Sequence, residues 1–290
     1  MQTTDALRAG RRELAGLDNL EIPLRPRKSG PRRAWGVVWP QLAAIGLALL
    51  VWQAVVWLGL KPSWVLPGPD AVLPELFRDF TSDTRLLEAI ATTLRRGATG
   101  FAVAILIGTL IGLAVTRFKL LRTAVASLIT GIQTMPSIAW FPLAILLFGL
   151  NESAIMFVVI LGAAPSVANG LIHGIDHIPP ILLRAGQVLG ARKLDKYRLV
   201  ILPAALPSFL GGLKQAWAFA WRSLMAGELL VIIANQPALG VRLQLQRELS
   251  DATGLIGTMV VVLAIGIIVL AINLVTDLSY AFLDPRVSYA

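Results

Sequence analysis

The chain has 290 residues, of which 56% are hydrophobic and 15% are charged, and its mean hydropathy is +0.72. A soluble domain carries about 25% charged residues, so this composition predicts an integral membrane protein and excludes disordered, coiled-coil and collagen-like chains. Because the chain has no cysteine, disulfides, thiol catalysis, zinc–thiolate sites and iron–sulfur clusters are also excluded.

The chain order predicts a short tail followed by one membrane domain. Residues 1–34 are polar and rich in arginine and proline, which predicts a basic cytoplasmic tail that can rest on anionic lipid. Residues 35–290 then form the transmembrane domain. Runs of about 20 apolar residues can cross the hydrocarbon core as helices. Six such runs are found, near residues 38–60, 96–116, 122–148, 153–174, 205–233 and 254–282.

Two features surround the second predicted span. The stretch before it, with five prolines and glycines from Pro62 to Pro74, is too broken to cross the membrane. From Leu86 an amphipathic helix is expected to lead into the span itself.

The distribution of positive charge predicts the topology. Segments on one side of the six spans hold 17 Lys and Arg residues, against 7 on the other. Because lysine and arginine resist translocation, both termini are predicted to lie in the cytoplasm, with the chain crossing the inner membrane several times. Topology then accounts for most of the net charge of +9, and no nucleic-acid partner is expected.

Residues 178–203 are unusual for a loop between spans. Pro179-Pro180 can start a helix, Gly190 allows a turn, and a second, more basic helix is predicted from Leu194 until Leu202-Pro203 ends it. Two short helices with one apolar side suit a groove on a soluble partner or the bilayer surface, and the pattern alone favours neither. The apolar side of the first helix consists of Ile181, Leu182, Ala185, Val188 and Leu189.

The spacing within this loop resembles that of the permease subunits of bacterial ABC importers. Their pattern is Glu-Ala-Ala, three residues, Gly, nine residues, Ile, one residue, Leu-Pro. Arg184 stands here for the Glu, Gly186 for the second Ala and Val200 for the Ile, and every spacing matches. In that family the loop is the coupling helix that enters a cleft on the ATPase subunit. The resemblance implies this role for Arg184, Ala185, Gly186, Gly190, Ala191, Leu194, Tyr197, Leu202 and Pro203.

Three further segments are similar to the nitrate, sulfonate and taurine permeases, with the aliphatic sulfonate permeases nearest. They are Trp-Val-Leu-Pro-Gly-Pro at 64–69, Met-Pro-Ser-Ile-Ala-Trp-Phe-Pro at 135–142 and Trp-Arg-Ser-Leu-Met-Ala-Gly-Glu-Leu at 221–229. The resemblance covers most of 40–282. It implies an all-α membrane protein of six transmembrane helices, with the type I ABC importer transmembrane-domain fold and a cytoplasmic coupling helix.

The resemblance also implies partners and a substrate class. A second permease copy (as a homodimer), two ABC ATPase subunits and an extracytoplasmic substrate-binding protein are expected, together with membrane lipid. Aliphatic sulfonate or taurine is the expected substrate, while relatives also carry nitrate, bicarbonate and a thiamine precursor. The chain has no phosphate-binding G-x-x-x-x-G-K-[ST] loop. It is therefore expected to be no enzyme and to hold no cofactor, with ATP and Mg bound by the partner ATPase.

Two charged residues interrupt the fifth predicted span. Arg222 and Glu228 would be costly in lipid unless each faces a cavity or a partner. Six residues correspond to about 600° of helix, so the two are expected to have different partners. Arg222 offers a positive site to an anionic substrate, or it is a structural anchor.

Other candidates for the translocation pathway lie in the third and fifth spans. Pro136 removes a backbone donor, so Met135-Pro136 is predicted to break the third span, as a gate or as a plain kink. Trp217 and Trp221 share a helix face and either line the pathway or pack. The full candidate set is Thr134, Met135, Pro136, Trp217, Trp221, Arg222, Ser223 and Glu228.

Alternatives from other classes remain open. His173 and His177 have metal-ligand spacing, but only Asp176 lies nearby as a third ligand, so no metal site is expected. A secondary transporter or channel that works without ATP would also fit six spans. A membrane enzyme has no supporting cluster of polar residues.

Overall fold

The computed structural model describes residues 30–82, 84–192 and 194–283, and every regular element within them is a helix. The chain divides into two compact units, residues 1–60 and 61–290. The first contains α2 (Gly30–Trp57). This helix begins within the segment predicted as a tail, and residues 1–29 of that segment lie outside the described residues.

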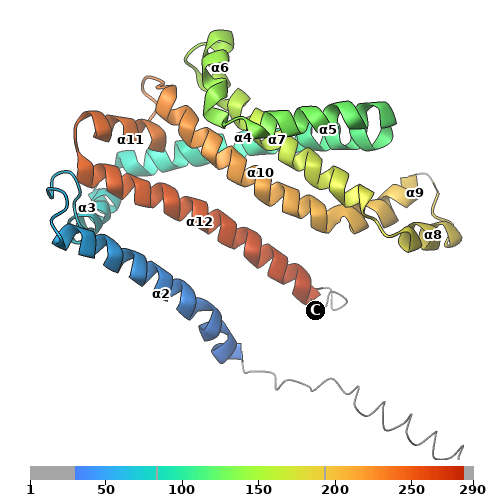
Figure 1. The fold of residues 1–290 in the computed structure, drawn as a ribbon, viewed down its shortest axis with the longest axis horizontal. Coiled ribbons are helices and arrows are strands. Elements are labelled where there is room, and N and C mark those ends of the chain that lie inside the picture. Colours follow the sequence, from blue (N-terminus) through green and yellow to red (C-terminus); the bar gives the residue numbers. More distant parts are fainter. Residues whose placement is uncertain (1–29, 83, 193, 284–290) are drawn as a thin grey trace, which may run out of the picture. The chain divides into compact units, whose positions relative to one another are not determined.

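The second unit contains the remaining helices, which follow the predicted spans closely (Figure 1). The short helices at 69–82 and 239–248 lie between predicted spans and were not predicted. In chain order the elements are α3 (Pro69–Ser82), α4 (Thr84–Arg117), α5 (Lys119–Thr134), η1 (Ser137–Trp140), α6 (Phe141–Phe148), α7 (Glu152–Asp176), α8 (Pro180–Val188), α9 (Leu194–Lys196), η2 (Tyr197–Ile201), α10 (Leu202–Leu230), α11 (Leu239–Glu248) and α12 (Ala252–Leu283).

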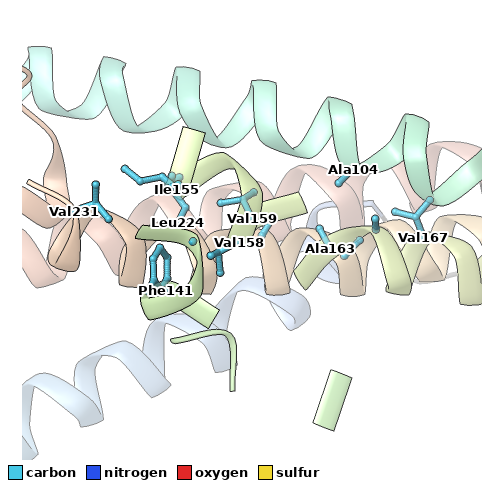
Figure 2. Packing of buried hydrophobic residues seen from close by; sticks show 14 residues of the cluster. Ala104, Phe141, Ile155, Val158, Val159, Ala163, Val167, Leu224 and Val231 are labelled. Atoms are coloured by element: carbon cyan, nitrogen blue, oxygen red, sulfur yellow. The ribbon is translucent and has the colours of Figure 1, made fainter. Parts of the chain in front are cut away.

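Helices α4, α7 and α10 lie side by side and form the centre of this unit (Figure 1). Small residues let their backbones approach closely, as is usual where membrane helices pack. A Cβ atom on Gly170 of α7 would lie 2.6 Å from the Cα atom of Gly212 on α10. Large apolar side chains fill the rest of the interior. Figure 2 shows Phe141, Val158 and Leu224 gathered there, and all three are fully buried.

Among the described residues, three helical segments are long and apolar enough to cross a membrane: α4, α7 and the run Tyr197–Leu230. A fourth span is counted if the pair Ser127–Thr134 and Ser137–Phe148, bent by 98°, is one broken span. The break falls at Met135 and Pro136, where the backbone is extended, so the predicted interruption of the third span is confirmed. The first and sixth predicted spans coincide with α2 and α12. Their apolar parts, Leu42–Trp57 and Ala252–Ile268, are shorter, and for these two a full crossing stays a prediction.

Candidate functional site

The 178–203 loop begins with a helix whose C-terminal end is capped by backbone hydrogen bonds. Helix α8 starts directly after Pro179 and ends in a turn at Gly190, whose φ is +84°. The Ala191 N–H donates to the Gly186 carbonyl (2.9 Å), and the Gly190 N–H donates to the Gln187 carbonyl (3.0 Å). This pair of bonds is the Schellman motif, which favours glycine at the left-handed position. The sequence therefore fixes the direction in which the loop turns.

The tip of this loop exposes apolar side chains. Val188 is 88% exposed and Leu189 is 87% exposed, and Ile181 and Leu199 are also exposed. Ile178, by contrast, is buried against the rest of the unit. Exposed apolar side chains at the end of a fixed helix are typical of a surface that another molecule covers.

Two positions that depart from the family pattern lie against each other in this loop. A Cβ atom on Gly186 would lie 2.7 Å from the Cγ2 atom of Val200. Gly186 is itself buried. The missing methyl group at 186 therefore makes room for the side chain at 200.

The second helix of the loop differs from the prediction. Only Leu194–Lys196 are α-helical, Tyr197–Ile201 form a π-helical turn, and the chain then enters α10 without a break. The prediction that Leu202-Pro203 ends a helix was wrong. Pro203 lies in the first turn of α10, directly after the π-helical turn.

The predicted coupling residues lie on this loop, as expected from their spacing. Gly186 is buried, Ala191 is half-buried, and the side chain of Leu194 lies outside the described residues. The exposed members are Arg184, Ala185, Gly190, Tyr197, Leu202 and Pro203.

At the opposite end of α10, a cluster of buried polar groups surrounds Glu228. The Glu228 carboxylate accepts hydrogen bonds from Arg96 Nη1 (3.2 Å) and Thr93 Oγ1 (2.8 Å) of α4. All three side chains are buried. Because a buried charge is costly unless it is paired and hydrogen-bonded, these contacts hold α4 and α10 together.

Backbone groups and further side chains complete this cluster. The Gly240 N–H donates to Glu228 Oε2 (3.1 Å), and the Leu239 N–H donates to Thr93 Oγ1 (3.0 Å), so the start of α11 is bound as well. Arg96 Nη2 donates to Gln236 Oε1 (2.5 Å), and Arg96 Nε lies 3.5 Å from Glu152 Oε1 at the start of α7. The Arg96–Glu228 cluster, which also comprises Thr93, Glu152, Gln236, Leu239 and Gly240, thus ties α4, α7, α10 and α11 together.

Arg222 is in a different environment on the same helix. Its Nε donates to the Ala218 carbonyl (3.0 Å), and its guanidinium carbon lies 4.9 Å from the centre of the Phe219 ring. Among the residues that the structure describes, no carboxylate forms a salt bridge with Arg222. Within the described part of the chain, an arginine inside a span therefore keeps an uncompensated charge.

Two cavities meet at Arg222. The first, of about 320 Å³, lies at the interruption between α5 and η1; we call it the break cavity. It is lined by Ile132, Gln133, Thr134, Met135, Pro136, Ser137, Ile138, Trp140, Leu161, Gly162, Phe219 and Arg222.

The second, of about 480 Å³, lies between α10, α11 and α12; we call it the apolar cavity. The rings of Trp217 and Trp221 stack along its wall with their centres 6.1 Å apart. It is lined by Trp217, Ala218, Trp221, Arg222, Leu243, Met259, Val262, Leu263, Gly266 and Ile267.

The structure thus brings together most of the candidate pathway residues. Thr134, Met135 and Pro136 meet Arg222 at the break cavity, and Trp217 and Trp221 meet it at the apolar cavity. The remaining two lie elsewhere. Ser223 is buried on the neighbouring face of α10 with no hydrogen-bond partner for its Oγ, and Glu228 lines neither cavity because it is bound in the Arg96–Glu228 cluster.

His173 and His177 contact each other at the end of α7. His173 and His177 stack with their ring centres 5.5 Å apart, and His177 Nδ1 lies 2.9 Å from the His173 carbonyl oxygen. Asp176 pairs with Arg122 instead. Over the described ranges, no group of three or more His, Cys, Asp or Glu side chains is placed to hold a metal ion.

Comparison with known proteins places this architecture in a family. Residues 104–289 match the inner membrane component of binding-protein-dependent transport systems, and this match includes α7, the 178–203 loop and α10. The chain belongs to this family. Its resemblance to the ABC permeases, read from the loop spacing, is therefore confirmed, as is the type I ABC importer fold.

Several curated permeases are similar to this family member over most of their length. The taurine transport system permease protein of Escherichia coli is 30% identical over 70% of this chain and 74% of its own. The nitrate import permease protein of Synechococcus elongatus is 29% identical over 73% and 80%. The putative aliphatic sulfonates transport permease protein of Bacillus subtilis is 26% identical over 83% and 85%.

A solved structure supports the fold independently. The crystal structure of an amino acid ABC transporter with histidines superposes with a TM-score of 0.54 over 73% of this chain and 98% of that one, at 17% identity. At that identity the likeness concerns the fold alone.

Proposed function

We propose that this permease imports a small anion across the cytoplasmic membrane, driven by ATP hydrolysis in a partner subunit. Aliphatic sulfonate or taurine is the preferred substrate, with nitrate or bicarbonate as alternatives. The observation that carries the proposal is an uncompensated arginine, Arg222, within a span of a chain similar to permeases of taurine, nitrate and aliphatic sulfonates. A cation in a span is retained where it faces a cavity or a substrate.

The 178–203 loop is the proposed contact with the ATPase. Its exposed side chains Val188 and Leu189 project from a helix end that the Gly190 turn fixes in place. A rigid apolar helix end suits insertion into a groove of a soluble partner. Each of two permease copies, paired as a homodimer, would engage one of two ATPase subunits, which bind ATP and Mg, and the permease itself would catalyse no reaction.

Helix α10 connects this loop to the rest of the permease. It runs without interruption from the π-helical turn after α9 past Arg222 to Glu228, a rise of about 40 Å. When ATP binding draws the two loops together, α10 would move as a rigid element and open the pathway towards the substrate-binding protein. ATP hydrolysis would then return α10 to its starting position. In this arrangement both termini lie in the cytoplasm.

The test is association and coupled transport in lipid nanodiscs. The permease is co-expressed with its genomic ATPase partner, and ATP hydrolysis is measured with the cognate binding protein loaded with an alkanesulfonate, taurine or nitrate. We expect Leu189→Asp to abolish association with the ATPase. Leu249→Asp, at a leucine that is 70% exposed beyond α11, is the matched control and should associate normally.

The alternative is an ATP-independent transporter or channel. It predicts substrate flux in vesicles that contain this chain alone, and the same flux in Leu189→Asp. That result, together with failure of the permease and the ATPase to associate, would overturn the proposed function.

A further inference from the structure

We propose that Arg222 and the two cavities beside it form a binding site within the permease for an organic anion that carries an apolar tail. The anionic head would lie at Arg222 in the break cavity and the tail along the apolar cavity. This inference rests on the proposed function and deepens it, because it assigns a selective site to the permease itself rather than to the binding protein alone.

The head of the ligand is indicated by the charge at Arg222. The guanidinium contacts one backbone carbonyl and one aromatic ring, so most of its donors stay available for a sulfonate-type oxyanion. None of the residues that line the break cavity is acidic. Gln133, Thr134 and Ser137 supply further polar groups to the same wall.

Neighbouring groups hold the polar wall in position. Gln133 Nε2 donates to Ser166 Oγ (2.9 Å), and Asn169 Nδ2 donates to Gln133 Oε1 (3.2 Å). The amide of Gln133 is therefore fixed before any ligand arrives. A fixed wall binds a ligand at a lower entropic cost than one that must first be ordered.

The tail of the ligand is indicated by the second cavity. Its volume of about 480 Å³ falls in the usual range of small-molecule sites. Apart from Arg222, its walls are apolar or aromatic, and they include Trp217, Trp221, Met259, Leu263 and Ile267. Because Arg222 lines both cavities, a head bound to it can place an attached alkyl chain directly against these side chains.

The two cavities predict an order of binding affinity among the anions that relatives carry. Nitrate has no apolar part, so it would leave the apolar cavity unused. Taurine carries an ammonium group two carbons from its sulfonate, and neither cavity has an acidic lining residue to pair with it. A buried ammonium group without such a partner is costly. An alkanesulfonate satisfies both cavities, so we expect it to bind more tightly than taurine and nitrate.

The experiment measures binding to the permease alone. The purified chain in phosphatidylcholine nanodiscs, without ATPase or binding protein, is titrated calorimetrically with methanesulfonate, butanesulfonate, hexanesulfonate, taurine and nitrate. We expect affinity to rise by up to about fourfold for each methylene that enters the apolar cavity. Arg222→Gln should weaken hexanesulfonate binding at least tenfold, and Arg222→Lys should restore part of it. Arg117→Gln, at an exposed arginine at the end of α4, is the control and should bind normally.

A second variant tests the tail separately from the head. A Cβ atom on Gly266 would lie 3.4 Å from Trp221 Nε1, in ordinary contact, so a larger side chain there extends into the apolar cavity. Gly266→Leu should weaken hexanesulfonate binding several-fold and leave methanesulfonate binding unchanged. Equal weakening of both ligands would overturn the two-part site.

Two other outcomes would also overturn the inference, and they differ from failure of the proposed function. If the permease binds no sulfonate in phosphatidylcholine, but nanodiscs with phosphatidylglycerol show that lipid bound through Arg222, the occupant is a lipid headgroup. If the permease alone binds no sulfonate while the complete complex transports it, selection belongs to the binding protein and the proposed function stands. The proposed function itself is contradicted by loss of ATP-coupled transport in the complete complex, or by ATP-independent flux through a permease that does not associate with the ATPase.

Discussion

Arg96 and Arg222 are both arginines within apolar helices, but they differ in burial and in the partners of their guanidinium groups. Arg96 is 1% exposed, and its guanidinium meets Glu228, Glu152 and Gln236. Arg222 is exposed, and its described contacts are a backbone carbonyl and an aromatic ring. The protein compensates the charge of Arg96, whereas the charge of Arg222 is available to a bound anion.

This difference separates a structural charge from a functional one. A buried ion pair holds helices in a defined arrangement, but removal of one partner leaves an uncompensated charge. An arginine without a carboxylate partner, beside two cavities, is instead available to an anion. Arg96 lies at the amphipathic start of its span and Arg222 lies within one, and the surroundings of each side chain distinguish the two roles.

The largest effect is expected from removing Glu228, the carboxylate that compensates the charge of Arg96. Glu228→Leu leaves a buried guanidinium without its carboxylate, which typically costs about 3–5 kcal/mol. We expect a large fall in the thermal unfolding temperature in nanodiscs, or failure to accumulate in the membrane. The double variant Arg96→Met/Glu228→Leu should recover much of the loss, because it leaves no buried charge unpaired. A double variant as unstable as the single one would show that the cluster contributes more than charge compensation.

A smaller loss is expected on the other side of the same guanidinium. Gln236→Ala removes the acceptor for Arg96 Nη2 but keeps the ion pair with Glu228. A hydrogen bond to a charged group contributes about 1.5–3 kcal/mol. The unfolding temperature should therefore fall less than in Glu228→Leu. Asn235→Ala is a poor control because Asn235 has a positive φ of 58°. Gln244→Ala on α11 is better suited, since the half-buried Gln244 donates to Glu248 Oε1 (2.7 Å) away from the Arg96–Glu228 cluster.

The sequence predicted the positions of the membrane-spanning helices better than it predicted the side-chain contacts between them. Hydropathy located α4, α7 and α10 to within a few residues except at the amphipathic start of α4, and Pro136 marked the break in the third span. These features depend on local chemistry, because backbone groups in lipid must be satisfied within each segment. The loop spacing identified the family for a similar reason, since it lies within 20 consecutive residues.

The Arg96–Glu228 cluster was not predicted, and Glu228 was assigned to the pathway instead. Thr93 and Arg96 lie more than 130 residues before Glu228, so their contact depends on how α4 packs against α10. One signal was present: Arg95 and Arg96 lie at the border of the apolar run that predicts the second span. A charge at such a border suggests a partner at the same depth on another span, and Glu228 was the available carboxylate.

A carboxylate introduced next to Arg222 would give it an ion-pair partner within the protein, as Glu228 does for Arg96. Ala218 lies one turn before Arg222 and lines the apolar cavity, so Ala218→Glu places a carboxylate beside the guanidinium. Pairing within the protein should then weaken hexanesulfonate binding about tenfold, which corresponds to about 1.4 kcal/mol. Ala218→Gln, of the same size and without charge, is the matched control and should weaken binding much less. Equal effects of the two variants would mean that bulk, rather than charge, is responsible.

The smallest effect is expected where the Arg96–Glu228 cluster reaches solvent. The Glu152 side chain is 42% exposed, and its carboxylate lies 3.5 Å from Arg96 Nε without forming a hydrogen bond to it. A pair this exposed contributes less than about 1 kcal/mol, and the position of Glu152 in the first turn of α7 adds a favourable dipole interaction of similar size at most. Glu152→Gln should therefore lower the unfolding temperature only slightly, by less than Gln236→Ala. The loss should shrink further at high salt, since exposed pairs are screened. A salt-independent loss as large as that of Gln236→Ala would contradict this expectation. Glu152 would then be one of the groups that hold the Arg96 guanidinium, and an exposed carboxylate would help to compensate its charge.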